Sequence, residues 1–188
     1  MSVKKILAAV VCLAMALGFS VSSAAEFPVE DFDAAGIYSD LETGTRSDKT
    51  RFTVKNFRRE TSMDSTDPVS KTWVCDFVEK STGNSDAKIA LVTNENDRVV
   101  SIMVVSKLDA ASSNENLAEA LITFSFAMTA YFGLTETELQ EMAVAFMTNP
   151  SAGKWSHWDS AHKKCVHVIS GMEKAVVGFV IYATDSED

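Results

Sequence analysis

The hydrophobic pattern of this chain changes from a period of two residues to a period of three or four, and then back again. Alternating apolar side chains are typical of half-buried strands, whereas apolar side chains at three- and four-residue steps are typical of an amphipathic helix. The predicted order of elements is therefore β-β-β-β-α-α-β-β. Strands segregated from helices indicate an α+β fold rather than an alternating one. The strand-like segments are 51–57, 71–79, 87–93, 98–108, 163–170 and 175–183.

Two helices joined by a short loop are predicted between the fourth and fifth of these segments. Ser112 with Glu115 and Thr135 with Glu138 have the spacing of capping boxes, which mark helix starts. Gly133 lies where the first helix should end, since glycine tolerates the left-handed conformation found there. We expect an antiparallel sheet of about six strands with this helical hairpin packed on one face.

The segments 87–93 and 98–108 are predicted to pair as a β-hairpin across the turn-forming residues 94–97. Their register cannot be fixed from the pattern, because a slip of one residue exchanges the two faces. Two alternatives follow for the neighbours of Ile89 and Leu91. The first is Ile102 and Val104, and the second is Val99, Met103 and Val105.

The first 25 residues have the three parts of a secretory signal peptide. Lys4 and Lys5 precede an apolar run over 6–19, and small residues lead to a cleavage site after Ala25. The apolar run is shorter than the roughly 20 residues that a spanning helix needs. We therefore expect export to the periplasm or the exterior, with cleavage after Ala25.

Cleavage would leave a single domain with short additions at both ends. The expected organisation is a signal peptide at 1–25, an irregular acidic arm at 26–50 with at most one helical turn, one α+β domain at 51–183, and an acidic tail at 184–188. The net charge changes from −9 to −11 when the two lysines of the signal are removed. Such acidity argues against a nucleic-acid partner, which requires clustered Lys and Arg. No later segment is long and apolar enough for a membrane span.

Cys75 and Cys165 are the two cysteines that remain after cleavage. In an oxidising compartment, a single pair of cysteines is most simply explained as one disulfide. It would close a loop of about 90 residues and contribute on the order of 4 kcal/mol. A metal site or two separate thiols are the alternatives.

All three histidines lie between Trp155 and His167, in the segment of the chain richest in chemistry-bearing side chains. Trp155, Trp158, His157 and His162 are the candidate ligand- or partner-binding residues, in a loop beside a groove between the helical hairpin and the sheet. The alternative is a metal site formed by His162, Cys165 and His167, because imidazole and thiolate suit Zn²⁺ or copper.

Charge is unevenly distributed along the chain. The interval 108–153 contains six acidic residues and no Lys or Arg. One interpretation is an acidic helical side that docks a cationic partner. The other is that the acids cap two helices whose remaining faces are buried.

No motif of a known catalytic class is present, and a local set such as Ser156, His157 and Asp159 gives no support for a triad, since triads assemble in space. We therefore expect a small, acidic, exported protein that is not an enzyme, needs no cofactor, and binds an unidentified protein or small ligand of the cell envelope. A metal-binding protein using the 157–167 cluster and a hydrolase without a recognisable motif are the alternatives. The oligomeric state is left open.

Overall fold

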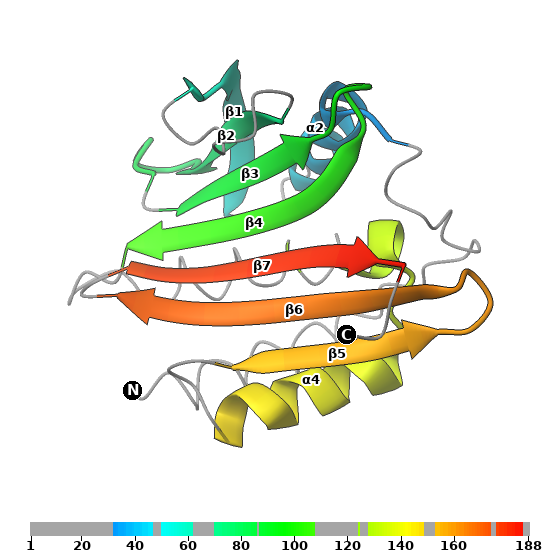
Figure 1. Cartoon of the computed structure of the whole chain (residues 1–188). Helices are drawn as coiled ribbons and strands as arrows, with labels where there is room; N and C mark the ends of the chain where they lie inside the picture. The colour runs from blue at the N-terminus through cyan, green and yellow to red at the C-terminus, as the bar shows by residue number, and fades with distance from the viewer. Residues whose placement is uncertain are drawn as a thin grey trace.

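A computed structural model describes residues 32–46, 50–61, 70–85, 87–107, 124, 128–148, 153–173 and 176–185 (Figure 1). The predicted signal peptide and the first capping box lie outside these residues. The labelled elements are α2 (Ala34–Thr45), β1 (Phe52–Arg59), β2 (Lys71–Glu79), β3 (Ala87–Thr93), β4 (Val99–Lys107), α4 (Glu136–Thr148), β5 (Lys154–Asp159), β6 (Lys164–Glu173) and β7 (Val176–Thr184).

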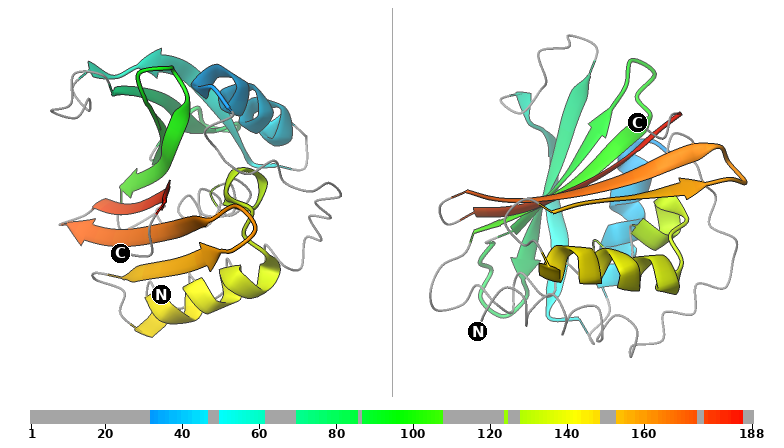
Figure 2. Two further views of the ribbon diagram at one scale, coloured as in Figure 1. Left: turned by 45° about the vertical axis from the view of Figure 1, so that its right-hand side comes forward. Right: turned by 60° about the horizontal axis from the view of Figure 1, so that its bottom comes forward.

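All seven strands belong to one antiparallel sheet in the order β1-β2-β3-β4-β7-β6-β5. The last strand along the chain therefore lies in the middle of the sheet, between β4 and β6. The strands fan around one another with a pronounced twist (Figure 2). The α+β class is confirmed, but the expectation of about six strands is wrong, because β5 adds a seventh at the edge.

The hairpin of β3 and β4 adopts the first of the two predicted registers. Ile89 lies opposite Val104 and Leu91 opposite Ile102, and all four side chains are buried. The side chain of Asn94 accepts hydrogen bonds from the backbone N–H groups of residues 96 and 98, which fixes the connecting turn.

The segment expected to be an irregular acidic arm contains a helix of three turns, so the expectation of at most one turn is wrong. Asp33 caps α2 by accepting a hydrogen bond from the backbone N–H of Gly36 at 2.6 Å. Ile37 and Leu41, four residues apart, lie on one face of the helix and are completely buried. The arm is thus part of the core.

The helices pack on the side of the sheet that contains the main hydrophobic core. Ile37 of α2 and Phe146 of α4 belong to one buried cluster with strand residues such as Phe179 of β7. The ring centroids of Phe146 and Phe179 lie 6.2 Å apart, and those of Phe124 and Phe179 also lie 6.2 Å apart. Residues 128–132 are helical, and Gly133 follows with a φ of 66°, as expected for a helix end. Most of the first predicted hairpin helix lies outside the described residues.

The opposite side of the sheet, which we call the outer face, follows from the strand registers. Side chains in alternate positions point to opposite faces. Over the four strands β4, β7, β6 and β5 the outer face carries Ser101, Met103, Val105, Lys107, Val176, Gly178, Val180, Tyr182, Thr184, Cys165, His167, Ile169, Gly171, Lys154, Ser156 and Trp158. None of the described helices is both long enough and apolar enough to cross a bilayer.

Candidate functional site

The segment predicted as a tryptophan-bearing loop is the edge strand β5. It pairs with β6 from Lys154 opposite Ile169 to Asp159 opposite Lys164, and a turn at residues 160–163 joins the two strands. The loop prediction is therefore wrong. The short alternation of polar and aromatic residues over 154–157, which Trp158 breaks, was the signal that could have identified the strand.

Among the described strands, β5 has a neighbour on one edge only. The backbone N–H of Ser170 donates to the carbonyl of Gly153, so these opposite residues form a hydrogen-bonded pair. Such pairs alternate along an antiparallel ladder. The N–H and C=O groups of Lys154, Ser156 and Trp158 consequently point away from β6, at the end of the strand order.

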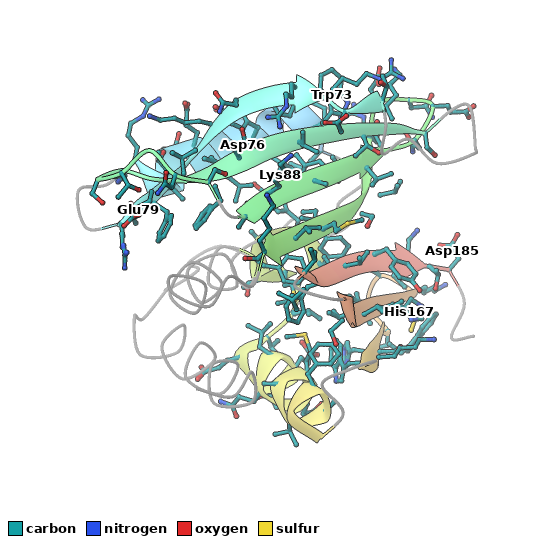
Figure 3. All side chains as sticks on the ribbon, turned by 90° about the vertical axis from the view of Figure 1, so that its left-hand side faces the viewer. Trp73, Asp76, Glu79, Lys88, His167 and Asp185 are labelled. Carbon is teal, nitrogen blue, oxygen red and sulfur yellow. The ribbon has the colours of Figure 1, made fainter. Side chains whose placement is uncertain are left out.

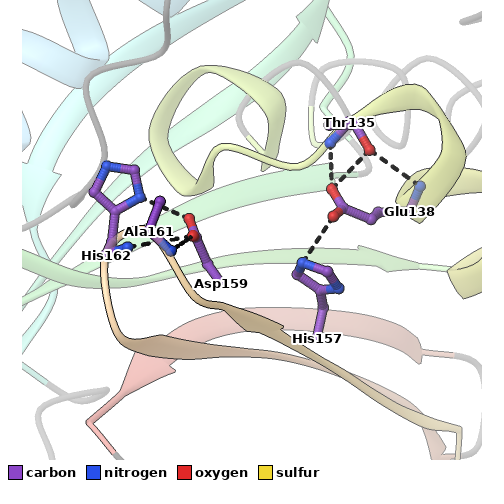
Figure 4. A network of polar contacts seen from close by, with 6 residues as sticks. All are labelled: Thr135, Glu138, His157, Asp159, Ala161 and His162. Atoms are coloured by element: carbon purple, nitrogen blue, oxygen red, sulfur yellow. Dashed lines mark hydrogen bonds and ion pairs between the residues drawn. The ribbon is translucent and has the colours of Figure 1, made fainter.

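Histidine 157 joins β5 to the start of α4. Its Nε2 lies 2.7 Å from Oε1 of Glu138 (Figure 4). The other carboxylate oxygen of Glu138 accepts hydrogen bonds from the backbone N–H of Thr135 at 2.6 Å and from its hydroxyl at 2.8 Å. The predicted second capping box is thus confirmed. The same carboxylate fixes both the helix start and the histidine.

Histidine 162 lies in the turn between β5 and β6 and contacts a different acid. Its Nδ1 lies 2.7 Å from Oδ2 of Asp159, whose Oδ1 accepts hydrogen bonds from the backbone N–H groups of Ala161 and His162 (Figure 4). Burial opposes ionisation of Asp159, but these hydrogen bonds outweigh it and lower the pKa of its carboxyl group. The arrangement stabilises a tight turn.

Histidine 167 is the buried histidine, with 2% of its surface exposed, on the outer face of β6 (Figure 3). Its Nδ1 lies 2.9 Å from the hydroxyl oxygen of Ser156, and its Nε2 lies 2.9 Å from that of Thr184. The ring stacks on Tyr182 with centroids 5.0 Å apart. Burial lowers the pKa of His167 below its usual 6.5, and the positive charge of Lys154 acts in the same direction.

These contacts do not assemble a catalytic triad from the residues considered above. Ser156 meets His167, while His157 meets Glu138 and Asp159 meets His162. The Ser156–His167 pair has a threonine hydroxyl on its far side rather than a carboxylate. A histidine that serves as a general base needs its imidazolium form stabilised. The environment of His167 does the opposite.

The metal site proposed from His162, Cys165 and His167 is not formed. Cys165 and His167 share the outer face as the strand period required, but both ring nitrogens of His167 contact hydroxyl groups. His162 turns toward Asp159 instead. Among the described residues, no group of three or more His, Cys, Asp or Glu could hold a metal ion.

The predicted disulfide between Cys75 and Cys165 is also wrong for this structure, in which no bond joins them. Both are buried, but Cys75 lies on the helix side of β2 and Cys165 on the outer face of β6. Three strands separate β2 from β6. At about 4.8 Å per strand this spacing exceeds the ~7 Å between Cα atoms that a disulfide tolerates.

We expect a reducing agent to leave the thermal unfolding midpoint unchanged, which scanning calorimetry with and without dithiothreitol would measure. A disulfide across this loop would contribute about 4 kcal/mol, and its loss would lower the midpoint by roughly 10 °C. Native Cys75 should also resist iodoacetamide, because burial, with a smaller effect of Asp76, raises the pKa of its thiol to about 12. A drop of the midpoint on reduction would contradict the strand order.

The two tryptophans of β5 lie on opposite faces of the sheet rather than side by side. Trp155 is on the helix side, where its ring stacks on His157 with centroids 5.9 Å apart. Trp158 is on the outer face, in the position opposite Cys165. Both side chains are half-buried. The four predicted binding residues therefore converge on β5 and its turn, but they do not share one surface.

The basic residues in and directly before β1 form ion pairs with acids of β2, a feature that the sequence pattern did not reveal. Arg58 forms a bidentate pair with Asp76, with both N–O distances at 3.1 Å, and Arg51 Nε lies 2.7 Å from Glu79. Burial opposes ionisation of Asp76, but the hydrogen bonds from Arg58 and Asn56 lower the pKa of its carboxyl group. With these acids beside it, this end of the sheet has less net positive charge than the sequence around β1 alone suggests.

No protein-family model matches the chain, and it has no significant match among the curated proteins or among the solved structures.

Proposed function

We propose that this chain is an exported, non-enzymatic binding protein that takes up an extended, basic segment of a partner protein as an eighth strand beside β5. The observation that carries the proposal is the outward-pointing backbone of Lys154, Ser156 and Trp158 at the end of the sheet. Strand addition to such an edge gains main-chain hydrogen bonds, and alternate side chains supply specificity.

The side chains of β5 suit this mode of binding. Trp155 and His157 flank the edge on the helix side, and Trp158 flanks it on the outer face. Aromatic side chains supply large contact areas at low entropic cost. The strand contains no proline, which is one of the usual means of blocking an edge against pairing.

On the helix side of β5, the acidic residues of α4 support a basic partner, whereas Lys154 of β5 itself lies on the outer face. Helix α4 runs alongside the strand in the opposite direction, because Glu138 meets His157 near one end and Gly153 approaches the Phe146 ring near the other. The first turn of α4 carries Glu136 and Glu138, and the exposed Glu141 follows. No Lys or Arg occurs in α4.

The test measures binding of an alternating Lys–Val octapeptide by isothermal titration calorimetry and by amide chemical shifts of β5. We expect saturable binding that moves the amide signals of Lys154, Ser156 and Trp158. The same peptide with alternate backbone nitrogens methylated should bind at least about tenfold more weakly, because it loses the donors of the new ladder.

A pair of variants at one position separates the edge from its side chain. Ser156→Pro removes the outward N–H, whereas Ser156→Ala removes only the hydroxyl that contacts His167. The proline variant should lose peptide binding, and the alanine variant should keep it. Equal binding of the methylated and unmethylated peptides, or no binding to the wild type, would reject strand addition.

A further inference from the structure

The outer face carries an apolar area at the end of β6 and β7 where exposed hydrophobic side chains gather. Ile169 and Val176, two of the most exposed large hydrophobic residues described, lie there with exposed fractions of 37% and 39%. Val105 and Val180 of the neighbouring strands are half-buried on the same face. Exposed apolar residues that gather in one place mark binding surfaces more often than scattered ones do.

The centre of this area is formed by two glycine residues, which have no side chains. Gly171 of β6 lies directly opposite Gly178 of β7, so both hydrogens point to the outer face at the same level. A Cβ atom built on Gly171 would meet no atom within 4 Å, and one built on Gly178 would meet only a carbonyl oxygen at 3.8 Å. Glycine within a strand weakens it and often marks a close approach by a ligand or another chain. Neighbouring side chains therefore border an unfilled strip of sheet.

Three lysines border the same area in a chain whose net charge is −9. The cross-strand row of the two glycines continues through Val105 to Lys88 of β3, which is labelled in Figure 3. Lys107 lies opposite Val176. Lys154 lies opposite Ile169. All three lysines are exposed. Within the described part of the chain, none of them forms an ion pair with an acid. Asp76, which neighbours Lys88, is occupied by Arg58.

We propose that this part of the outer face binds a long-chain carboxylate as a single molecule. Its carboxylate would pair with Lys88 and Lys107, and its alkyl chain would lie over Gly178 and Gly171 between Ile169 and Val176. The charge of the lysines complements the carboxylate, and the apolar strip of Val105, Gly178 and Gly171 crosses two strand spacings from β4 to β6, or about 10 Å. The groups that would contact the carboxylate and the alkyl chain lie on β3, β4, β7 and β6, whereas Lys154 of β5 borders both this site and the edge used in strand addition.

Dodecanoate below its micellar concentration is the probe, and calorimetry together with methyl chemical shifts of Ile169 and Val176 is the readout. We expect saturable binding to the wild type and binding about tenfold weaker, or worse, for dodecanol, which lacks the charge. Lys88→Gln combined with Lys107→Gln should weaken dodecanoate binding to a similar extent. Lys163→Gln, in the exposed turn at the opposite end of β6, removes one charge and should leave binding unchanged.

Gly171→Val tests the shape of the surface. The Cβ atom of the new side chain meets no atom within 4 Å and valine favours strands, so the thermal midpoint should not fall, while the strip is filled and binding is lost. The proposal is overturned by an absence of saturable dodecanoate binding to the wild type, or by full binding to the valine variant. Binding to anionic vesicles without binding to monomeric dodecanoate would equally overturn it in favour of a membrane surface.

Discussion

Gly153→Ala should lower the free energy of unfolding by about 2–3 kcal/mol, one of the two largest effects that we expect. A Cβ atom at this position would lie 2.2 Å from Cδ1 of Phe146, 2.8 Å from its Cε1 and 2.8 Å from the hydroxyl oxygen of Ser170. The Phe146 ring is buried and packs against Phe179, so it has little room to retreat. Thermal denaturation should show a midpoint lowered by roughly 5–10 °C.

The matched control is Gly44→Ala in α2, where an added Cβ meets nothing within 4 Å. Alanine is the better helix former by about 1 kcal/mol, so this variant should be more stable than the wild type. In the Gly153→Ala background, Phe146→Leu should recover part of the loss, because it makes room for the new methyl group. A Gly153→Ala protein that melts with the wild type would contradict the close approach of α4 to β5.

His167→Ala should cost about 2–3 kcal/mol, since it empties a buried position and leaves two hydroxyl groups without their partner. The ring contacts Ser156 on one side and Thr184 on the other, so it joins the edge strand β5 to the central strand β7 across β6. Urea denaturation measures the change. His162→Ala, in the exposed turn, is the control and should cost less than about 1 kcal/mol.

The same histidine should make stability depend on pH in a defined direction. Its folded-state pKa lies below 6.5, so the unfolded chain binds a proton more readily than the folded one. The contribution of the neutral His167 side chain to the free energy of unfolding is fully present above about pH 6.5. It is lost as the pH falls through the folded-state pKa of this histidine. Denaturation series between about pH 7.5 and pH 5 should show the wild type losing stability that His167→Gln does not lose. Parallel curves for the two proteins would refute this assignment.

Strands with continuous β-branched or alternating apolar residues could be predicted from the sequence closely. The segments 71–79 and 87–93 coincide with β2 and β3, and the β6–β7 hairpin is displaced by only one to three residues. The two capping features at Gly133 and Thr135 were also predictable, because they depend on local backbone chemistry.

Helix α2 and strand β5 were not predicted, because their hydrophobic patterns are mixed. Helix α2 contains Gly36 and Gly44 and is acidic, which hides the spacing of Ile37 and Leu41. Strand β5 carries half-buried side chains on both faces, so its alternation in hydrophobicity is weak. In both cases tertiary burial decided the structure, and a single sequence reports burial only indirectly.

The predictions for the candidate site were wrong where they depended on pairing between strands that are far apart in the sequence. The residues Cys75 and Cys165 satisfy every rule of composition for a disulfide, but composition does not say which face of the sheet each cysteine occupies. The position of each cysteine in the sheet depends on β7 pairing between β4 and β6, and this pairing joins strands that are far apart in the sequence. The residues grouped around His157 lie on β5, its turn and β6, and each histidine contacts a separate partner.

The central position of β7 has a consequence for the order of folding. Strands β1 to β4 can pair by successive hairpins as they are synthesised, and β5 with β6 can do the same. The link between these two groups within the sheet is β7, whose pairing with β4 joins residues such as Ser101 and Ile181. Closing so long a loop is slow compared with hairpin formation. A nascent chain lacking β7 would therefore hold two half-sheets with open edges. Pairing of the final strand would therefore determine when the complete sheet can form.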